Sequence, residues 1–378
     1  MREDGPVTRG EGSVMSDDPT TGRNENGKSS ESQPLLDIRN LEVGFRTEDG
    51  VVQAVRGVSF QVRPGEILAV VGESGSGKSV TQLGLLGLLP KRTARISGEV
   101  WFRTGGDSGT GRELLAMPES KLRKLRGKDI AMIFQDPMTA LNPVHRIGKQ
   151  IGEIIRLHDK SVSAETAEQR AVELLGLVGV SQPETRVRQY PHEFSGGMRQ
   201  RVMIAMAIAN DPDLLIADEP TTALDVTIQA QVLNLLQKAQ AETGAATILI
   251  THDLGVVAEM AERVVVMYAG KIVETGPVGD LFARPRHPYT EGLLNSIPRL
   301  DLEEQELTAI PGNPPNMLHP PAGCAFAPRC ALRQGRMRCV TETPELIELG
   351  RDRSTACHFH DELGADATDS DDPQEASR

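Results

Sequence analysis

Residues 72–79 read GESGSGKS and follow directly on the apolar run ILAVV, residues 67–71. A short, continuous apolar run is typical of a strand buried on both faces, and the apolar segment at residues 80–89 predicts a helix ended by Pro90. Glycines between a strand and a helix let the backbone point successive N–H groups at an anion, and the helix N-terminus adds positive potential. The pattern predicts a phosphate-binding loop.

The chemistry of this loop is that of a nucleoside triphosphate site. Lys78 is placed to reach the β- and γ-phosphates, and the hydroxyl of Ser79 can ligate Mg²⁺. A glycine-rich surface loop is the alternative, which the flanking strand and helix disfavour. We therefore predict ATP and Mg²⁺ as ligands. The predicted binding residues are Gly72, Glu73, Ser74, Gly75, Ser76, Gly77, Lys78, Ser79 and Val80.

Two adjacent acids follow a second apolar run, in LLIADEP at residues 214–220. Asp218 is predicted to hold Mg²⁺ through water, and Glu219 to polarise the attacking water as general base. A solvated strand end would not require both acids. His252 follows a third predicted strand, residues 247–250, where its side chain can reach the γ-phosphate, although a lone histidine is more often structural. Together these residues predict ATP hydrolysis, with Lys78 in the catalytic set.

Composition narrows the class of protein. The 378 residues are 38% hydrophobic, which suffices for a sizeable core. The net charge of −12 is concentrated at the ends, and aromatic residues make up 3% of the chain, so stacking platforms for nucleic acid are few. We expect no nucleic-acid partner. Neither a spanning apolar run nor a signal peptide is evident, and a location in the cytoplasm is expected.

The chain is predicted to be an α/β protein in several parts. Residues 1–34, poor in large apolar side chains, predict a disordered leader, and residues 361–378 an acidic disordered tail. An ATPase domain is expected over residues 35–281, with an antiparallel β layer before the phosphate loop and a helical subdomain at about residues 143–200. Proline enrichment after residue 281 predicts a separate, cysteine-containing C-terminal appendage at residues 282–360.

All four cysteines lie in this appendage, with the spacing C-x5-C-x8-C-x17-C. The spacing differs from the paired C-x2-C of zinc ribbons, and a disulfide-stapled domain is not expected in a reducing compartment. Four thiolates can hold zinc or an iron–sulfur cluster, and free structural thiols are the third possibility. The predicted metal ligands are Cys324, Cys330, Cys339 and Cys357.

The sequence FSGGMRQR, residues 194–201, resembles the signature motif of ABC-transporter ATPases. Ser195, Gly196 and Gly197 match that motif, whereas Phe194 and Met198 depart from its commonest form, LSGGQ. In the family, the signature serine and glycines open a helix whose N-terminus binds the γ-phosphate held by the opposite subunit, in agreement with anion binding at helix ends. The resemblance implies an ABC-type P-loop ATPase core that works as a dimer.

Further positions carry over from the same resemblance. Gln135 is similar to the Q-loop glutamine, which also contacts Mg²⁺, Asp225 to the D-loop aspartate, and His252 to the switch histidine. Phe45 is a candidate for stacking on adenine, with an ordinary core position as the alternative. The segment after Gln135, residues 136–148, would contact a membrane subunit, and its other interpretation is a proline-bounded loop.

The C-terminal motifs RPRHPYTEGLLNSIPRL, IPGNPPN and GCAFAPRC resemble the ATPase subunits of oligopeptide and dipeptide importers, over roughly residues 35–359. The resemblance implies a homologous ATPase partner, two transmembrane permease subunits, an extracytoplasmic substrate-binding protein and a peripheral position on the cytoplasmic face of the membrane. It also implies a [4Fe–4S] cluster on the four cysteines. Nickel and glutathione importers share much of the pattern and stay open as alternatives.

Two other classes of function are weighed against this one. Soluble ABC ATPases of DNA repair or translation typically add coiled-coil insertions or a second ATPase domain, and neither is evident in the sequence. A regulatory module that binds ATP without hydrolysing it would not need the full set of Lys78, Asp218, Glu219 and His252. ATP hydrolysis coupled to peptide import is therefore the preferred function.

Overall fold

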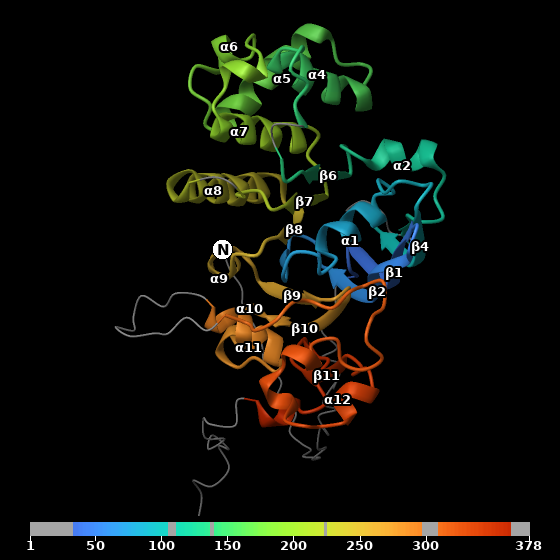
Figure 1. Cartoon of the computed structure of the whole chain (residues 1–378). Coiled ribbons are helices and arrows are strands. Elements are labelled where there is room, and N and C mark those ends of the chain that lie inside the picture. Colours follow the sequence, from blue (N-terminus) through green and yellow to red (C-terminus); the bar gives the residue numbers. More distant parts are fainter. Residues whose placement is uncertain (1–32, 105–110, 137–139, 223–224, 297–308, 364–378) are drawn as a thin grey trace, which may run out of the picture. The chain divides into compact units, whose positions relative to one another are not determined.

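The computed structural model describes residues 33–104, 111–136, 140–222, 225–296 and 309–363 (Figure 1). The chain divides into two compact units, Met1–Ser32 and Gln33–Arg378. The first unit lies outside the described residues, so the predicted leader is described only at residues 33 and 34. The predicted tail is described only at residues 361–363, of which Asp361 and Glu362 belong to a 3-10 turn, His360–Glu362.

Four strands form a small antiparallel sheet in the order β2-β1-β4-β5. β1 and β2 come before the phosphate loop in sequence, and β4 and β5 come after it. β1 and β2 form the hairpin expected from the polar turn, with Thr47 paired to Gly50. Alternating apolar residues of these strands are buried, as expected of a sheet with one face on the core. The strands are β1 (Leu36–Thr47), β2 (Gly50–Val62), β4 (Ala94–Phe102) and β5 (Arg112–Glu113).

A larger sheet of eight strands carries the centre of the fold, in the order β11-β12-β10-β9-β3-β8-β7-β6. The run β9-β3-β8-β7-β6 is parallel, and β3, β7 and β8 are buried along their whole length. The strands are β3 (Ile67–Val71), β6 (Ile130–Ile133), β7 (Leu214–Asp218), β8 (Ala246–Ile250), β9 (Arg263–Tyr268), β10 (Lys271–Pro277), β11 (Ile347–Gly350) and β12 (Arg353–Thr355). Since β3, β7 and β8 are parallel neighbours, the residues that follow them meet at one edge of the sheet.

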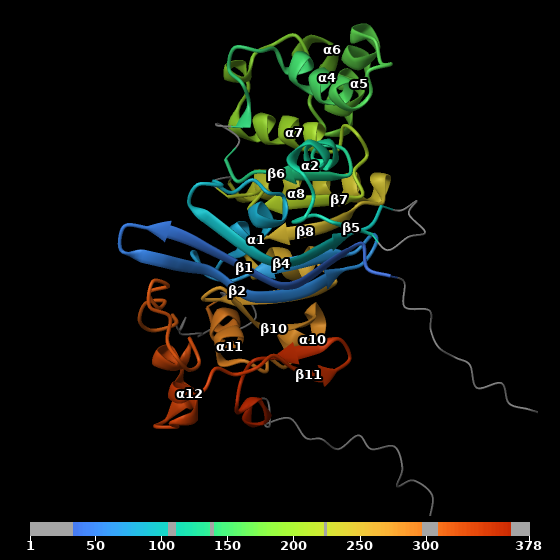
Figure 2. The same cartoon turned by 90° about the vertical axis from the view of Figure 1, so that its right-hand side faces the viewer.

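Helices cover this sheet and build the helical subdomain, in which α4, α5 and α6 gather beyond α7 (Figures 1 and 2). Their starts follow local capping chemistry; for example, Ser163 accepts a hydrogen bond from the Thr166 amide and begins α5. The helices before the C-terminal region are α1 (Lys78–Leu85), α2 (Glu119–Leu125), α4 (Ile147–His158), α5 (Ala164–Leu177), α6 (Pro183–Arg186), α7 (Gly196–Ala207), α8 (Val226–Thr243) and α9 (Leu254–Met260). The predicted mixed α/β fold with antiparallel and helical subdomains is confirmed.

The C-terminal region is joined to the central sheet. β12 pairs with β10 and β11 pairs with β12, so the sheet continues into residues that were expected to form a separate appendage. The region also contains α10 (Val278–Ala283), α11 (Pro288–Asn295), α12 (Arg338–Thr341) and short 3-10 turns at Ala327–Arg329 and Ala331–Arg333. Within the described residues, no helix has the length and apolarity needed to cross a membrane.

Candidate functional site: a nucleotide-binding edge of the sheet

The phosphate loop connects β3 to α1 and lies tightly against β9. Gly72 has φ of +148°, and a Cβ at this position would lie 2.2 Å from the carbonyl oxygen of Met267. The carbonyl of Ser76 accepts a hydrogen bond from the Gly270 amide at 3.0 Å, which ties the loop to the β9–β10 turn. Only glycine fits at Gly72, because both the backbone angle and the approach of β9 exclude a side chain.

Lys78 is the first residue of α1, and its side chain reaches back to the start of the phosphate loop. Its side chain is buried, and Nζ donates hydrogen bonds to the carbonyls of Gly72 at 2.7 Å and Glu73 at 3.0 Å. Burial lowers the pKa of Lys78, while Glu219, Asp218 and Glu73 oppose that shift. Of the other predicted loop residues, Gly77 is the N-cap of α1, Ser76 is buried, Ser79 and Val80 are half-buried, and Ser74 and Gly75 are exposed.

Asp218 at the end of β7 meets the first turn of α1. The hydroxyl of Ser79 donates a 2.9 Å hydrogen bond to Oδ1 of Asp218. Burial raises the pKa of Asp218, against the effect of the Ser79 hydrogen bond and Lys78. The predicted pair of magnesium ligands, which are 139 residues apart in sequence, is thus brought together by the pairing of β3, β8 and β7.

Glu219 occupies the turn after β7 with φ of +47°, an unusual angle for a residue with a side chain. Its Oε2 accepts hydrogen bonds from Nε2 of Gln135 at 3.0 Å and from Oγ1 of Thr222 at 2.7 Å. Its Oε1 lies 3.5 Å from Nδ1 of His252. The structure therefore joins the three predicted residues Gln135, Glu219 and His252. Thr222 was missed, although it follows the acidic motif by three residues in sequence.

The signature residues lie at the start of α7. Ser195 is the N-cap of that helix and accepts a hydrogen bond from the Met198 amide. A Cβ on Gly197 would lie 2.9 Å from the side chain of Ile228, so this glycine allows α8 to approach closely. Asp225 is in turn the N-cap of α8 and accepts from the Ile228 amide at 3.0 Å. The signature and the D-loop aspartate are thus packed together through the starts of two helices.

Phe45 lies on β1, paired with Val52 and Ala94. Its side chain is half-buried and packs at the margin of the core cluster beneath the antiparallel sheet. A half-buried ring can serve as a core side chain, and its exposed part can also contact a nucleobase. Stacking on adenine stays a prediction.

The prediction of a [4Fe–4S] cluster, or of zinc, on the four cysteines is wrong. Among the residues that the structure describes, which include all four cysteines, no group of three or more Cys, His, Asp or Glu side chains is arranged to hold a metal ion. Burial raises the pKa of Cys324 and Cys330, and that of Cys357 to about 12, which favours the thiol over the metal-binding thiolate. Cys324 and Cys330 instead pack on the apolar cluster around Tyr268 and Phe326.

Two family models match the chain. The ABC transporter model covers residues 55–222, which include the phosphate loop, the signature and the acidic strand end. The model described as the C-terminal region of oligopeptide/dipeptide transporters covers residues 273–339. The two matches together span the nucleotide site and most of the region after it.

Curated relatives agree with these matches. An oligopeptide transport ATP-binding protein of Mycobacterium tuberculosis is 53% identical over 325 residues, 86% of this chain and 52% of the relative. A dipeptide transport ATP-binding protein of Bacillus subtilis is 53% identical over 302 residues, 80% of this chain and 88% of the relative. An oligopeptide transport ATP-binding protein of Bacillus subtilis is 56% identical over 296 residues, 78% and 81% of the two chains. The chain spans about half the length of the mycobacterial relatives it matches.

A solved structure of a dimeric ATP-binding cassette in a post-hydrolysis state, bound to ADP and phosphate, has a TM-score of 0.56 and 26% identity to this chain. It matches 65% of this chain and 99% of its own. Fold and site together define an ATP-binding cassette of the ABC transporter class. Within that class, the chain belongs to the family of ATP-binding proteins of oligopeptide and dipeptide transporters.

Proposed function

We propose that this chain is the ATP-hydrolysing subunit that energises import of dipeptides or oligopeptides through a membrane ABC transporter. The observation that carries the proposal is that functional groups converge at the ends of the parallel strands β3, β6, β7 and β8. They are Lys78, the Ser79–Asp218 pair, and Glu219 with its partners Gln135 and His252. The family match supplies the substrate class, because relatives named for oligopeptide and dipeptide transport share more than half of their aligned residues with this chain.

The residues at this edge fit MgATP by their chemistry. The loop amides and Lys78 would bind the phosphates, and Ser79 and Asp218 would hold Mg²⁺, with Gln135 beside them. The metal ion, when bound, neutralises charge on the phosphates. Glu219 would accept the proton of the attacking water as general base, and Gln135, Thr222 and His252 would orient its carboxylate. Phe45 is proposed to stack on adenine.

The signature serine caps α7, whereas the phosphate loop leads into α1, so the two predicted phosphate-binding elements begin different helices of one subunit. We therefore propose that each ATP is held between the phosphate loop of one subunit and Ser195, Gly196 and Gly197 of a homologous partner, with Asp225 near the dimer interface. The dimeric state of the solved cassette supports this arrangement. Catalysis would then belong to the dimer, and nucleotide would act by biasing its open and closed states.

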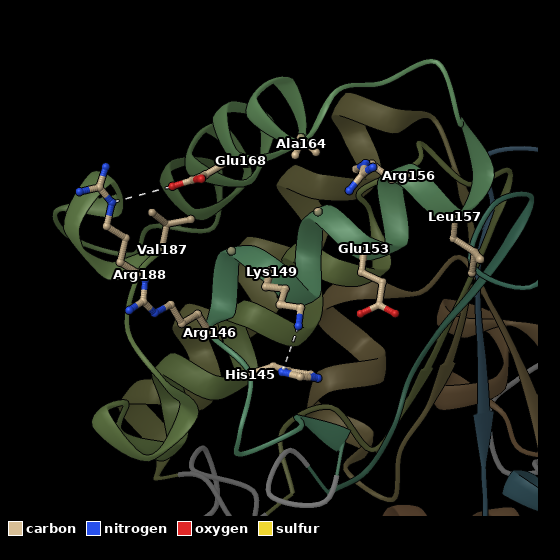
Figure 3. Close-up of a pocket in the computed structure, with 13 residues that line it drawn as sticks. His145, Arg146, Lys149, Glu153, Arg156, Leu157, Ala164, Glu168, Val187 and Arg188 are labelled. Atoms are coloured by element: carbon tan, nitrogen blue, oxygen red, sulfur yellow. Dashed lines mark hydrogen bonds and ion pairs between the residues drawn. The ribbon is translucent and has the colours of Figure 1, made fainter.

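A groove of about 630 Å³ between α4, the start of α5 and residues 187–188 supports the proposed contact with a permease subunit (Figure 3). Basic side chains outnumber acidic ones around it: Arg146, Lys149, Arg156 and Arg188, against Glu153 and Glu168. Two apolar side chains are exposed here: Val144, which precedes α4 and is 72% accessible, and Leu157, which lies in the last turn of α4 and is 66% accessible. We propose that a short amphipathic segment with acidic residues, from a permease subunit, binds here.

The complex proposed from these contacts contains a homologous ATPase, two transmembrane permease subunits and an extracytoplasmic substrate-binding protein. Its permease contacts would place this chain peripherally on the cytoplasmic face of the membrane. The predicted boundaries, with an ATPase domain over residues 35–281 and a C-terminal region over residues 282–360, are retained as a proposal.

Growth of the source organism on defined dipeptides and oligopeptides as the only source of a required amino acid tests this function. A strain lacking the chain is expected to grow on the free amino acid and to fail on the peptides, and the intact gene should restore growth. Equal growth on peptides with and without the chain would contradict the proposal. A defect confined to nickel or glutathione supply would instead favour those cargoes.

A further inference from the structure

Arg329, in the C-terminal region, is bound to the phosphate loop. It ends the 3-10 turn Ala327–Arg329, and its side chain is 5% accessible. Nη1 donates to Oε2 of Glu73 at 2.7 Å and Nη2 donates to Oε1 at 3.0 Å, so the guanidinium bridges both carboxylate oxygens. Glu73 is the second residue of the loop, 256 positions earlier in the chain. A two-pronged pair of this kind fixes orientation as well as charge.

The guanidinium is itself held from several sides. Its Nε donates to the carbonyl of Pro311 at 2.8 Å, Nη2 to that of Ile310 at 3.3 Å, and Nη1 to the hydroxyl of Tyr268 at 3.3 Å. The hydrogen bond to Glu73 is the main reason that the pKa of Arg329 lies above its ordinary value. Arg329 is therefore a permanently charged group with a fixed position, since most of its donors have partners.

Glu73 connects this arginine to the catalytic lysine. Its amide donates to the hydroxyl of Tyr289 on α11 at 2.7 Å, and its carbonyl accepts the 3.0 Å hydrogen bond from Nζ of Lys78. Tyr289 packs with Tyr268 and Phe326, and burial raises its pKa. The C-terminal region thus holds both the backbone and the side chain of the residue that hydrogen-bonds Lys78.

The same region contacts the sheet that carries the candidate adenine residue. The Gln53 amide on β2 donates to the carbonyl of Met317 at 3.0 Å. β2 is the hairpin partner of β1, on which Phe45 lies. Residues 310–329 therefore contact the phosphate loop through Arg329 and the antiparallel sheet through Met317.

We propose that Arg329 is a positioning residue of the nucleotide site, through which the C-terminal region holds the phosphate loop in the conformation that binds ATP and neutralises the Glu73 carboxylate beside the triphosphate. This inference rests on the proposed ATPase function. Without Arg329, an unpaired negative charge would remain in a loop that must bind an anion, and Glu73 would keep only its backbone contact with Tyr289 as a link to the C-terminal region.

The test compares full-length R329M with the parent chain. Arg336→Met is the matched control, because Arg336 forms the same two-pronged pair with Glu362, at 2.9 and 2.7 Å, within the C-terminal region. R329M is expected to raise KM for ATP about ten-fold with kcat changed less than about three-fold, since a fixed charge pair is removed from the binding step. Hydrogen exchange of a peptide covering residues 70–79 should become faster in R329M and stay at the parent rate in R336M.

Two further variants keep the test decisive if R329M does not fold. R329K retains the charge but cannot bridge both oxygens, so loop exchange should be intermediate and KM should rise less than in R329M. E73Q weakens the pair but leaves no unpaired carboxylate in the loop, so loop exchange should rise as in R329M, whereas KM for ATP should rise less than in R329M. A folded R329M with parental loop exchange and parental KM would overturn the positioning proposal. If the parent chain does not hydrolyse ATP, the proposed function fails. The hydrogen-exchange rate of residues 70–79 still tests whether Arg329 positions the phosphate loop.

Discussion

The hydroxyl of Ser79 donates a 2.9 Å hydrogen bond to Asp218, and this bond joins the first turn of α1 to the end of β7. Because Asp218 is buried and lies near Glu219, its ionised form is disfavoured in the folded protein. Ionisation of Asp218 at neutral pH therefore reduces the stability of the nucleotide-free protein. The first prediction tests this effect of Asp218 on stability.

Asp218→Asn is expected to stabilise the nucleotide-free protein at neutral pH. The folded-state pKa of Asp218 is raised, so its contribution to stability is most favourable in acid and is lost as pH rises through that pKa. The variant should melt on the order of 2 °C above the parent at pH 7.5, with the difference shrinking as pH falls toward 4. Thermal melts over this range check it, with exposed Asp211→Asn as the control. A lower melting temperature at pH 7.5 would refute the explanation. MgATP should stabilise the parent but not D218N.

Glu219→Gln should abolish turnover and leave MgATP binding intact. The amide keeps the shape of the side chain but cannot accept a proton from water, and loss of a general base typically lowers the rate about 10²- to 10⁴-fold. Release of phosphate and retention of labelled ATP measure the two effects. Glu242→Gln, on the exposed face of α8, should behave as the parent. Parental turnover in E219Q would remove Glu219 from the mechanism.

Gly72→Ala should disrupt the phosphate loop. The added Cβ would lie 2.2 Å from the Met267 carbonyl, at a backbone angle that alanine rarely adopts. Strain of this kind amounts to about 1–3 kcal/mol, so the variant is expected to melt at a lower temperature and to bind ATP at least about ten-fold more weakly. Gly279→Ala on α10 is the control, because a Cβ added there would meet no atom within 4 Å apart from its chain neighbours and the backbone of its own helix. Unchanged ATP affinity in G72A would be inconsistent with the loop's close contact with β9.

Lys149→Glu should weaken assembly with the permease subunits without affecting ATP hydrolysis by a dimer of the ATPase subunits. Lys149 lines the basic groove, and charge reversal there would repel the acidic segment proposed to bind it. Recovery of permease subunits with tagged ATPase, washed at two salt concentrations, measures the effect. Arg170→Glu on α5 is the control, because it reverses a charge outside the groove, and it should recover permease subunits as the parent does. Equal recovery with K149E and the parent would place the permease contact elsewhere.

The parts of the site that could be predicted from sequence are those whose residues lie within one short stretch of the chain. β3, the phosphate loop and α1 are consecutive, and the acids at Asp218 and Glu219 directly follow a run of apolar residues. The apolar runs of β7 and β8 were recognisable because strands buried on both faces lack polar alternation. The order of those strands in the sheet then brings Ser79 to Asp218, which no local pattern specifies.

Long-range contacts account for what sequence reasoning missed. The pairing of β10 with β12 and the bridge from Arg329 to Glu73 join segments about 80 and 256 positions apart, and neither leaves a periodic signal. For the cysteines the error was a predicted site that the described residues do not form. Their count and clustering suggested metal ligands, but coordination depends on geometry and on thiolate formation. The half-buried thiols of Cys324 and Cys357, whose pKa values are raised, favour neither.

The rate of ATP hydrolysis by the complex reconstituted in lipid, measured against the concentration of peptide-loaded binding protein, tests the central claim most directly. We predict a rate that rises and saturates with peptide-loaded binding protein, rises less with the empty binding protein, and is lost when this chain carries E219Q. A rate that does not depend on peptide, or that persists at the parental level in the E219Q complex, would contradict the account.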